Sequence, residues 1–225
     1  MRVLRGRAAT IDADRDATAR LLTDAGEAGG RAVRVWTPHR QAAFGRRDAR
    51  ADGYEAARAA AERHGFPPVE RDVGGRAVAY AGTTLAFALA EPVADLREGI
   101  DERYERATSA VERALRSVGV DADRGEPADA FCPGTHSLQR GGKLVGIAQR
   151  VRQDAALVAG VAIVADREEL AAVLADVYGA LDVPFDPDAV GSVATAGGPA
   201  DPEPVREAIE RAFVGDRDAA VERVD

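Results

Sequence analysis

The sequence is poor in lysine, cysteine, methionine and tryptophan, each of which occurs once in 225 residues. A single cysteine excludes an internal disulfide, and one cysteine with three scattered histidines does not have the spacing of a metal site. No apolar run approaches the roughly 18 residues that span a bilayer. The first 14 residues lack the apolar core of a signal peptide. We therefore expect a cytoplasmic protein that has no metal ion and does not associate with a membrane.

Positive charge is also in deficit, because 38 acidic residues face 30 basic ones and the net charge is −8. The arginines are interspersed with acidic residues, whereas nucleic-acid binding requires clustered positive charge. The composition therefore argues against a nucleic-acid partner. The lone lysine, Lys143, stands out in a chain that otherwise uses arginine. Lysine is a compact point charge whose protonation can be tuned, so this position indicates a site where arginine will not serve.

Periodic patterns predict a mixture of strands and helices. Strands are expected at 2–9, 32–36, in three pieces within 69–90, and near 136–140, 143–151 and 155–165. Helices are expected at 12–28 with Asp12 as N-cap, at 52–65, 95–118, 167–180 and 202–214. Several expected hairpins favour an α/β (α+β) fold in which helices flank a mixed β-sheet. We expect one domain over 1–214, followed by an exposed tail over 215–225.

Cys132 and Lys143 lie eleven positions apart in the chain. A hairpin of 132–140 with 143–151 would bring the thiol and the ammonium together. A nearby ammonium favours the thiolate, which is the nucleophilic form of cysteine. The alternative is that the cysteine is a small buried hydrophobe. His136 is a second candidate base, but we favour the interpretation that it is a surface residue of a strand.

A second candidate site is Gly74-Gly75, which is flanked by Arg71 and Arg76. A Gly-Gly pair between strands can be a hairpin turn alone, but it also lets a ligand approach backbone N–H groups closely. Arginines pair with carboxylates or phosphates. The spacing matches neither the dinucleotide fingerprint nor a Walker loop. On a later strand, the small Gly146 and Ala148 alternate with larger residues and leave one face open for a ligand.

Two blocks of sequence, Gly-Gly-Arg-Ala-Val at 74–78 and Gly-Lys-Leu-Val-Gly-Ile-Ala-Gln-Arg at 142–150, resemble the signature blocks of the lipoate–protein ligase and octanoyltransferase superfamily. That superfamily shares its catalytic fold with biotin–protein ligases, so the resemblance implies a biotin/lipoate protein ligase catalytic domain. Trp-Thr-Pro at 36–38, Phe-Gly-Arg-Arg-Asp at 44–48 and Val-Pro-Phe-Asp-Pro at 183–187 resemble further family segments. Phe-Cys-Pro-Gly at 131–134 is similar to the cysteine-dependent amidotransferase branch, as is Arg-Asp-x-Gly-Gly at 71–75.

The resemblance implies that Cys132 takes an octanoyl or lipoyl group as a thioester and hands it to a lysine of a lipoyl domain. Partner proteins would be the glycine-cleavage H protein and the E2 subunits of 2-oxoacid dehydrogenases, and no cofactor is required. Lys143 would contact the acyl carbonyl and stabilise the thiolate. The expected acyl site comprises Arg71, Gly74, Gly75, Arg76, Ala77, Val78, Tyr80, Gly146 and Ala148.

Two alternatives to the transferase stay open. The first is an ATP-dependent lipoate–protein ligase, which acts through an acyl-adenylate and needs ATP and Mg; some archaeal ligases also have a separate accessory chain. Ligases often carry His where this chain has Tyr80 and Asn where it has Ala86, which argues against adenylate chemistry here. The second alternative is a non-catalytic acyl-carrier binding protein of the same fold.

Overall fold

A computed structural model describes residues 1–71, 75–95, 98–152 and 154–224. In these ranges a large β-sheet has eight strands, in the order β11-β1-β2-β6-β10-β9-β8-β7. Strand β1 is parallel to its neighbours β11 and β2, and every later pair is antiparallel. The bounds are β1 Arg2–Gly6, β2 Ala32–Trp36, β6 Thr84–Pro92, β7 Asp123–Arg124, β8 Ser137–Gln139, β9 Lys143–Val151, β10 Ala155–Ile163 and β11 Ala220–Val224. The predicted mixed sheet is confirmed.

A small second sheet has the order β4-β3-β5, with bounds β3 Gln41–Phe44, β4 Pro68–Glu70 and β5 Val78–Tyr80. Strand β4 is parallel to β3 and strand β5 is antiparallel to it. The segment 69–90 is therefore not a series of hairpins, since its first two strands flank β3 and its third strand belongs to the large sheet. The link between β4 and β5, which contains Gly75, is not a hairpin turn.

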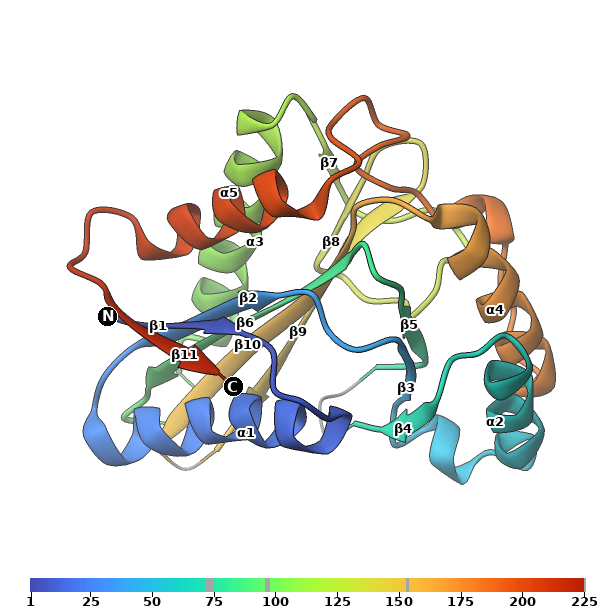
Figure 1. Cartoon of the computed structure of the whole chain (residues 1–225), viewed down its shortest axis with the longest axis horizontal. Helices are drawn as coiled ribbons and strands as arrows, with labels where there is room; N and C mark the ends of the chain where they lie inside the picture. The colour runs from blue at the N-terminus through green and yellow to red at the C-terminus, as the bar shows by residue number, and fades with distance from the viewer. Residues whose placement is uncertain (72–74, 96–97, 153, 225) are drawn as a thin grey trace.

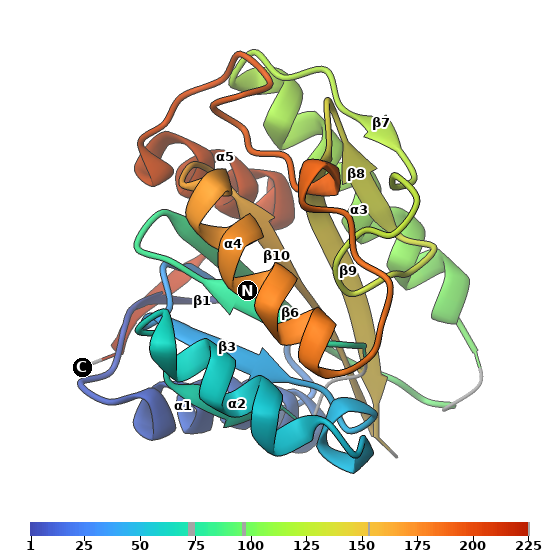
Figure 2. The same cartoon turned by 90° about the vertical axis from the view of Figure 1, so that its right-hand side faces the viewer.

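Five helices of the described chain cover the sheets: α1 Ile11–Ala28, α2 Tyr54–Arg63, α3 Ile100–Ser117, α4 Arg167–Ala180 and α5 Pro202–Val214. Helix α1 lies on one face of the large sheet, and α3 and α5 lie on the other (Figure 1). Helices α2 and α4 pack together beside the small sheet (Figure 2). In α3, Val111 and Leu115 are fully buried and lie on the one apolar face that its periodicity predicts.

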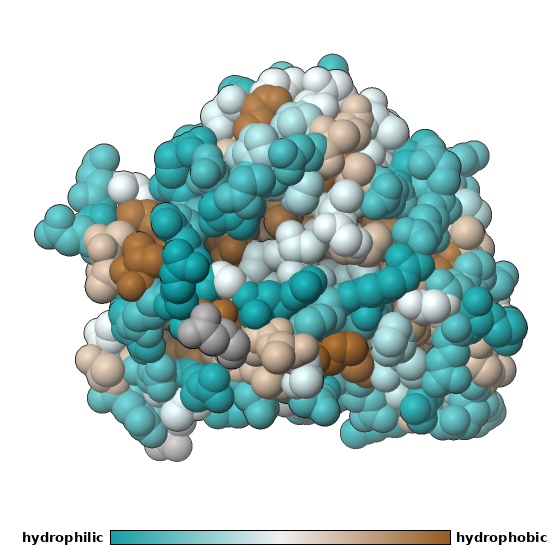
Figure 3. Space-filling view, in the orientation of Figure 1, coloured by the Kyte–Doolittle hydropathy of each residue, from teal (hydrophilic) through white to brown (hydrophobic). Residues whose placement is uncertain are grey.

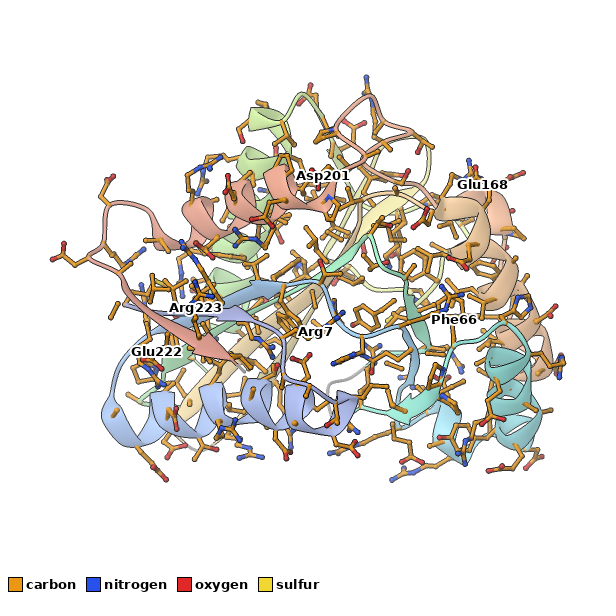
Figure 4. The ribbon with its side chains drawn as sticks, viewed as in Figure 1. Arg7, Phe66, Glu168, Asp201, Glu222 and Arg223 are labelled. Carbon is orange, nitrogen blue, oxygen red and sulfur yellow. The ribbon has the colours of Figure 1, made fainter. Side chains whose placement is uncertain are left out.

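Helix α1 begins at Ile11, and its N-cap lies two residues before the predicted Asp12. The cap is Thr10, whose side-chain oxygen accepts a hydrogen bond from the backbone N of Ala13 at 3.2 Å. Asp12 lies in the first turn, where its negative charge interacts favourably with the positive end of the helix dipole. Asp201, labelled in Figure 4, caps α5 by accepting from the backbone N of Glu203 at 3.0 Å.

The predicted exposed tail contains β11, whose side chains are largely exposed although its backbone pairs with β1. Arg2 of β1 donates to Glu222 of β11 at 2.8 and 2.9 Å, at the left of Figure 4. Hydrophilic residues predominate on the face drawn in Figure 3, with apolar residues scattered between them. Throughout the described ranges, every helix is too short or too polar to cross a bilayer.

A buried ion pair ties α1 to the large sheet. The Asp14 carboxylate pairs with Arg34 of β2 and also accepts from the indole N–H of Trp36 at 2.9 Å. Arg34 donates to Thr18 Oγ1 at 2.8 Å, and its guanidinium carbon lies 4.2 Å from the centre of a Trp36 ring. Because both charged side chains are buried, each depends on the other for compensation.

Replacing Asp14 with alanine leaves the Arg34 guanidinium buried and unpaired. We expect Asp14→Ala to lower the free energy of unfolding by about 3–5 kcal/mol, measured by urea titration followed by circular dichroism. The matched control is Asp16→Ala, an exposed aspartate on the same helix, which should change stability by at most about 0.5 kcal/mol. Equal effects of the two substitutions would show that the buried pair does not anchor α1.

Candidate functional site

A cavity of about 660 Å³ lies between α1, the large sheet and the small sheet. Its lining includes Leu22 of α1, Ala86 of β6, Val78 and Tyr80 of β5, and the loop over 131–136 that precedes β8. Its volume falls in the range of small-ligand sites, which is about 300–1,000 Å³. The cavity is therefore large enough for a small organic ligand.

Small residues of neighbouring strands form the floor of this cavity. Gly146 and Ala148 of β9 pair with Val161 and Ala159 of β10, and all four line the cavity. Residues two apart on a strand share one face of the sheet, so this row of small side chains leaves space above the sheet. Gly146 and Ala148 thus lie where an open strand face was expected.

Cys132 lies at the wall of the cavity in a left-handed backbone conformation, with φ +43°. This conformation is uncommon for a residue with a side chain, so the surroundings must hold it. The backbone N of Cys132 donates to the Tyr178 hydroxyl at 2.5 Å, and that hydroxyl donates to the carbonyl of Ala77 at 3.0 Å. Tyr178 therefore links the cysteine loop to the segment before β5.

The Cys132 sulfur lies against Gly75 and Arg71. Arg71 Nη2 donates to Sγ at 3.2 Å and to the carbonyl of Arg76 at 2.5 Å. A Cβ at position 75 would lie 2.5 Å from Sγ, and Gly75 has φ +101°. Only glycine satisfies both the space and the backbone conformation. The glycine predicted for close approach thus lies in contact with the candidate nucleophile.

Lys143 is fully buried beside this loop. Its Nζ donates to Glu126 Oε2 at 2.6 Å, to the carbonyl of Phe131 at 3.0 Å and to the carbonyl of Cys132 at 2.9 Å. These three bonds use all three protons of the ammonium. The predicted hairpin is confirmed, because β8 and β9 are antiparallel neighbours, and it brings Lys143 to the Cys132 main chain. The role of Lys143 at the thiolate stays a prediction.

Glu126 organises the same loop from outside the predicted site. Its Oε1 accepts from the backbone N of Gly134 at 2.8 Å, and its Oε2 accepts from Ser137 Oγ at 2.8 Å as well as from Lys143. Nothing in the acidic segment 119–130 distinguishes this carboxylate from its neighbours. Only the fold shows that it compensates the buried ammonium.

The remaining predicted residues divide into two groups. Those that line the cavity are Arg71, Gly75, Val78, Tyr80, Gly146 and Ala148. Arg76 instead pairs with the buried carboxylate of Asp48 at 3.1 Å, and Ala77 is fully buried. Gly74 lies outside the described residues. Burial raises the pKa of Tyr80, although the positive charge of Arg71 opposes that shift.

His136 stacks on Tyr104 of α3, with ring centres 3.8 Å apart and an interplanar angle of 8°, and both residues line the cavity. Tyr178 lies deeper, and burial raises the pKa of its hydroxyl well above the usual range. Its position in α4 matches the spacing of core residues, so the sequence contains no signal for its bond to Cys132. Among the described residues, no cluster of three or more His, Cys, Asp or Glu side chains is placed to hold a metal ion.

The family model of the lipoyl protein ligase A/B catalytic domain matches residues 16–214. An octanoyl-[GcvH]:protein N-octanoyltransferase of Exiguobacterium sibiricum is 34% identical over 124 residues, which cover 54% of this chain and 44% of the relative. A lipoyl-[GcvH]:protein N-lipoyltransferase of Listeria monocytogenes is 26% identical over 52% of this chain and 43% of the relative. The chain thus matches less than half the length of each.

Solved structures share the fold. A lipoate-protein ligase A bound with ATP has a TM-score of 0.78 at 20% identity and covers 100% of this chain and 88% of its own. A bi-partite lipoate protein ligase from Thermoplasma acidophilum has a TM-score of 0.74 at 19% identity, with coverage of 100% and 87%. The predicted biotin/lipoate protein ligase type of fold is therefore confirmed.

Removing the Tyr178 hydroxyl leaves the half-buried N–H of Cys132 and the buried carbonyl of Ala77 without their partner. We expect Tyr178→Phe to lower the free energy of unfolding by about 1–3 kcal/mol, measured by urea titration. The matched control is Tyr54→Phe, because the Tyr54 hydroxyl bonds Glu70 at an exposed position. A loss no larger than that of Tyr54→Phe would mean that Tyr178 does not hold the cysteine loop.

Proposed function

Because this chain belongs to the lipoyl protein ligase A/B catalytic domain family, we propose that it transfers an octanoyl or lipoyl group to a lysine of a lipoyl-carrier protein through a thioester on Cys132. One observation carries the proposal: the Cys132 sulfur lies at the cavity wall, 3.2 Å from Arg71 Nη2. Relatives of the matched stretch are named as octanoyl and lipoyl transferases, which supports the same chemistry here.

The proposed reaction has two acyl transfers. In the first, the Cys132 thiolate attacks the carbonyl carbon of an acyl-lysine amide on a donor carrier protein. The C–S bond forms, the C–N bond breaks, and the departing lysine nitrogen takes up one proton. In the second, a lysine amine of the acceptor protein attacks the thioester, the C–N bond forms, and the thiolate leaves. The attacking amine releases one proton, so protons and electrons balance without a cofactor.

The apolar part of the cavity would hold the acyl chain. Burying each CH₂ contributes about 0.8 kcal/mol, so an eight-carbon chain gains several kcal/mol from the slot above Ala148 and Ala159. The partners in this proposal are lipoyl-domain proteins, such as the glycine-cleavage H protein and the E2 subunits of 2-oxoacid dehydrogenases. We place the enzyme in the cytoplasm, where a thiol remains reduced.

Intact mass spectrometry after mixing with an octanoylated H protein, without ATP, tests the proposal. Wild type should gain an octanoyl adduct that hydroxylamine removes, and Cys132→Ser should gain none that hydroxylamine removes. If neither protein gains an adduct, yet both lipoylate a lipoyl domain when lipoate, ATP and Mg are supplied, the chain is the ATP-dependent ligase instead. Failure in both assays would favour the non-catalytic binding protein.

The cavity floor yields a prediction about chain length. Ala159→Leu places a larger side chain where the acyl chain would lie. We expect it to lower kcat/KM for an octanoyl donor by about tenfold, equivalent to two CH₂ groups left unburied, and to lower kcat/KM for a butyryl donor much less. The control is Ala56→Leu at an exposed position of α2, which should affect neither donor. Equal losses for both donors would place the acyl chain elsewhere.

A further inference from the structure

Charged and titratable groups face Cys132 from several elements. They are Arg71 after β4, Tyr80 of β5, Tyr178 of α4, Lys143 of β9, and Glu126 before β8. Tyr178 is fully buried and Tyr80 is half-buried, and burial raises the pKa of each hydroxyl. At neutral pH they are therefore uncharged. Among the described residues, the charged side chains placed at or beside the cysteine loop are Arg71, Lys143 and Glu126, and His136 is a further titratable side chain at the same cavity wall.

Lys143 and Glu126 compensate each other. The shortest bond of the ammonium, at 2.6 Å, goes to Glu126, and its other two protons go to the carbonyls of Phe131 and Cys132. No proton of the ammonium remains for the sulfur in this arrangement. The Lys143–Glu126 pair therefore holds the main chain of the loop, and its ammonium makes no hydrogen bond to Sγ.

Arg71 is placed differently. Its Nη2 donates to the sulfur and to the carbonyl of Arg76, and its Nε is buried without a hydrogen-bond partner in the described part of the chain. The absence of a side chain at Gly75 allows this approach, because a Cβ there would lie 2.8 Å from Nη2. Burial acts to lower the pKa of Arg71, but the neighbouring Cys132 and then Tyr80 outweigh it, and the net direction is upward.

We infer that Arg71 is a catalytic residue, whose guanidinium stabilises the Cys132 thiolate by direct contact with the sulfur. This inference deepens the proposed function and rests on it, because Arg71 is catalytic only if Cys132 carries the acyl group. Arginine keeps its charge at every working pH, so the stabilisation is constant. It acts when the thiolate attacks the donor amide, and again when the thiolate leaves the thioester.

The test is the rate at which iodoacetamide alkylates Cys132, measured without any acyl donor from about pH 5 to pH 10. Cys132 is the sole cysteine, so mass spectrometry reports it directly. A positive charge in contact with the sulfur favours the thiolate over the thiol. We therefore expect Arg71→Gln to react about tenfold more slowly at neutral pH and to approach the wild-type rate at high pH. Arg71→Lys should retain most of the neutral-pH rate.

The matched control is Arg40→Gln, because Arg40 contacts Gly65, Glu169 and the Phe66 ring rather than the sulfur; it should leave the profile unchanged. Arg71→Met, which keeps the buried apolar stem, replaces Arg71→Gln if circular dichroism shows that the latter is unfolded. An unchanged profile, or a rate lowered by one factor at every pH, overturns the inference, because the second result indicates only altered access.

The outcome is separable from that of the proposed function. If the alkylation profile depends on Arg71 while wild type gains no octanoyl thioester, the proposed function fails and the assignment of Arg71 as the partner of the thiolate stands. If the thioester forms and the pH profile of alkylation is the same with and without Arg71, the inference alone is wrong. In that case Lys143→Met should move the profile instead.

Discussion

The buried ammonium of Lys143 is the constraint on which the candidate site depends. Removing a charge from water costs several kcal/mol unless neighbouring groups compensate it, and here one carboxylate and two main-chain carbonyls do so. Those carbonyls belong to residues 131 and 132, so the ammonium draws the loop back over β9 and helps to hold Cys132 in its left-handed conformation. Arginine has a planar fork of donors and does not match three acceptors that converge on one atom. This geometry explains why a chain rich in arginine keeps one lysine.

The two cations of the site have separate tasks in the function that we propose. Lys143 shapes the main chain, and Arg71 contacts the sulfur. Between them, Gly75 and Tyr178 bring the segment before β5 against the cysteine loop. The small sheet therefore takes part in the site although it is separate from the large one. The acyl slot needs neither cation, because its floor consists of small side chains on β9 and β10.

Local features of the site could be predicted from the sequence. The β8–β9 hairpin and the approach of Lys143 to the cysteine loop follow from residue types and spacing within one short segment, although the ammonium meets the Cys132 carbonyl rather than the thiol. Long-range features could not. The position of Gly75 against the sulfur joins segments 57 residues apart and required the fold. The order β4-β3-β5 depends on pairing between segments more than twenty residues apart, and the bond from Tyr178 to Cys132 joins two elements that periodicity treats as independent. Arg71 was identified as an anion-binding residue, but its contact with the sulfur required the fold.

The central claim is that an acyl group on Cys132 lies on the reaction path. The most direct measurement is a single-turnover chase of isolated acyl-enzyme, mixed rapidly with an unmodified lipoyl domain in the absence of ATP. We expect the octanoyl group to move from the protein to the domain lysine at a rate at least equal to steady-state turnover, with recovery of the free thiol. Transfer much slower than turnover, or transfer that requires ATP, would contradict the thioester mechanism.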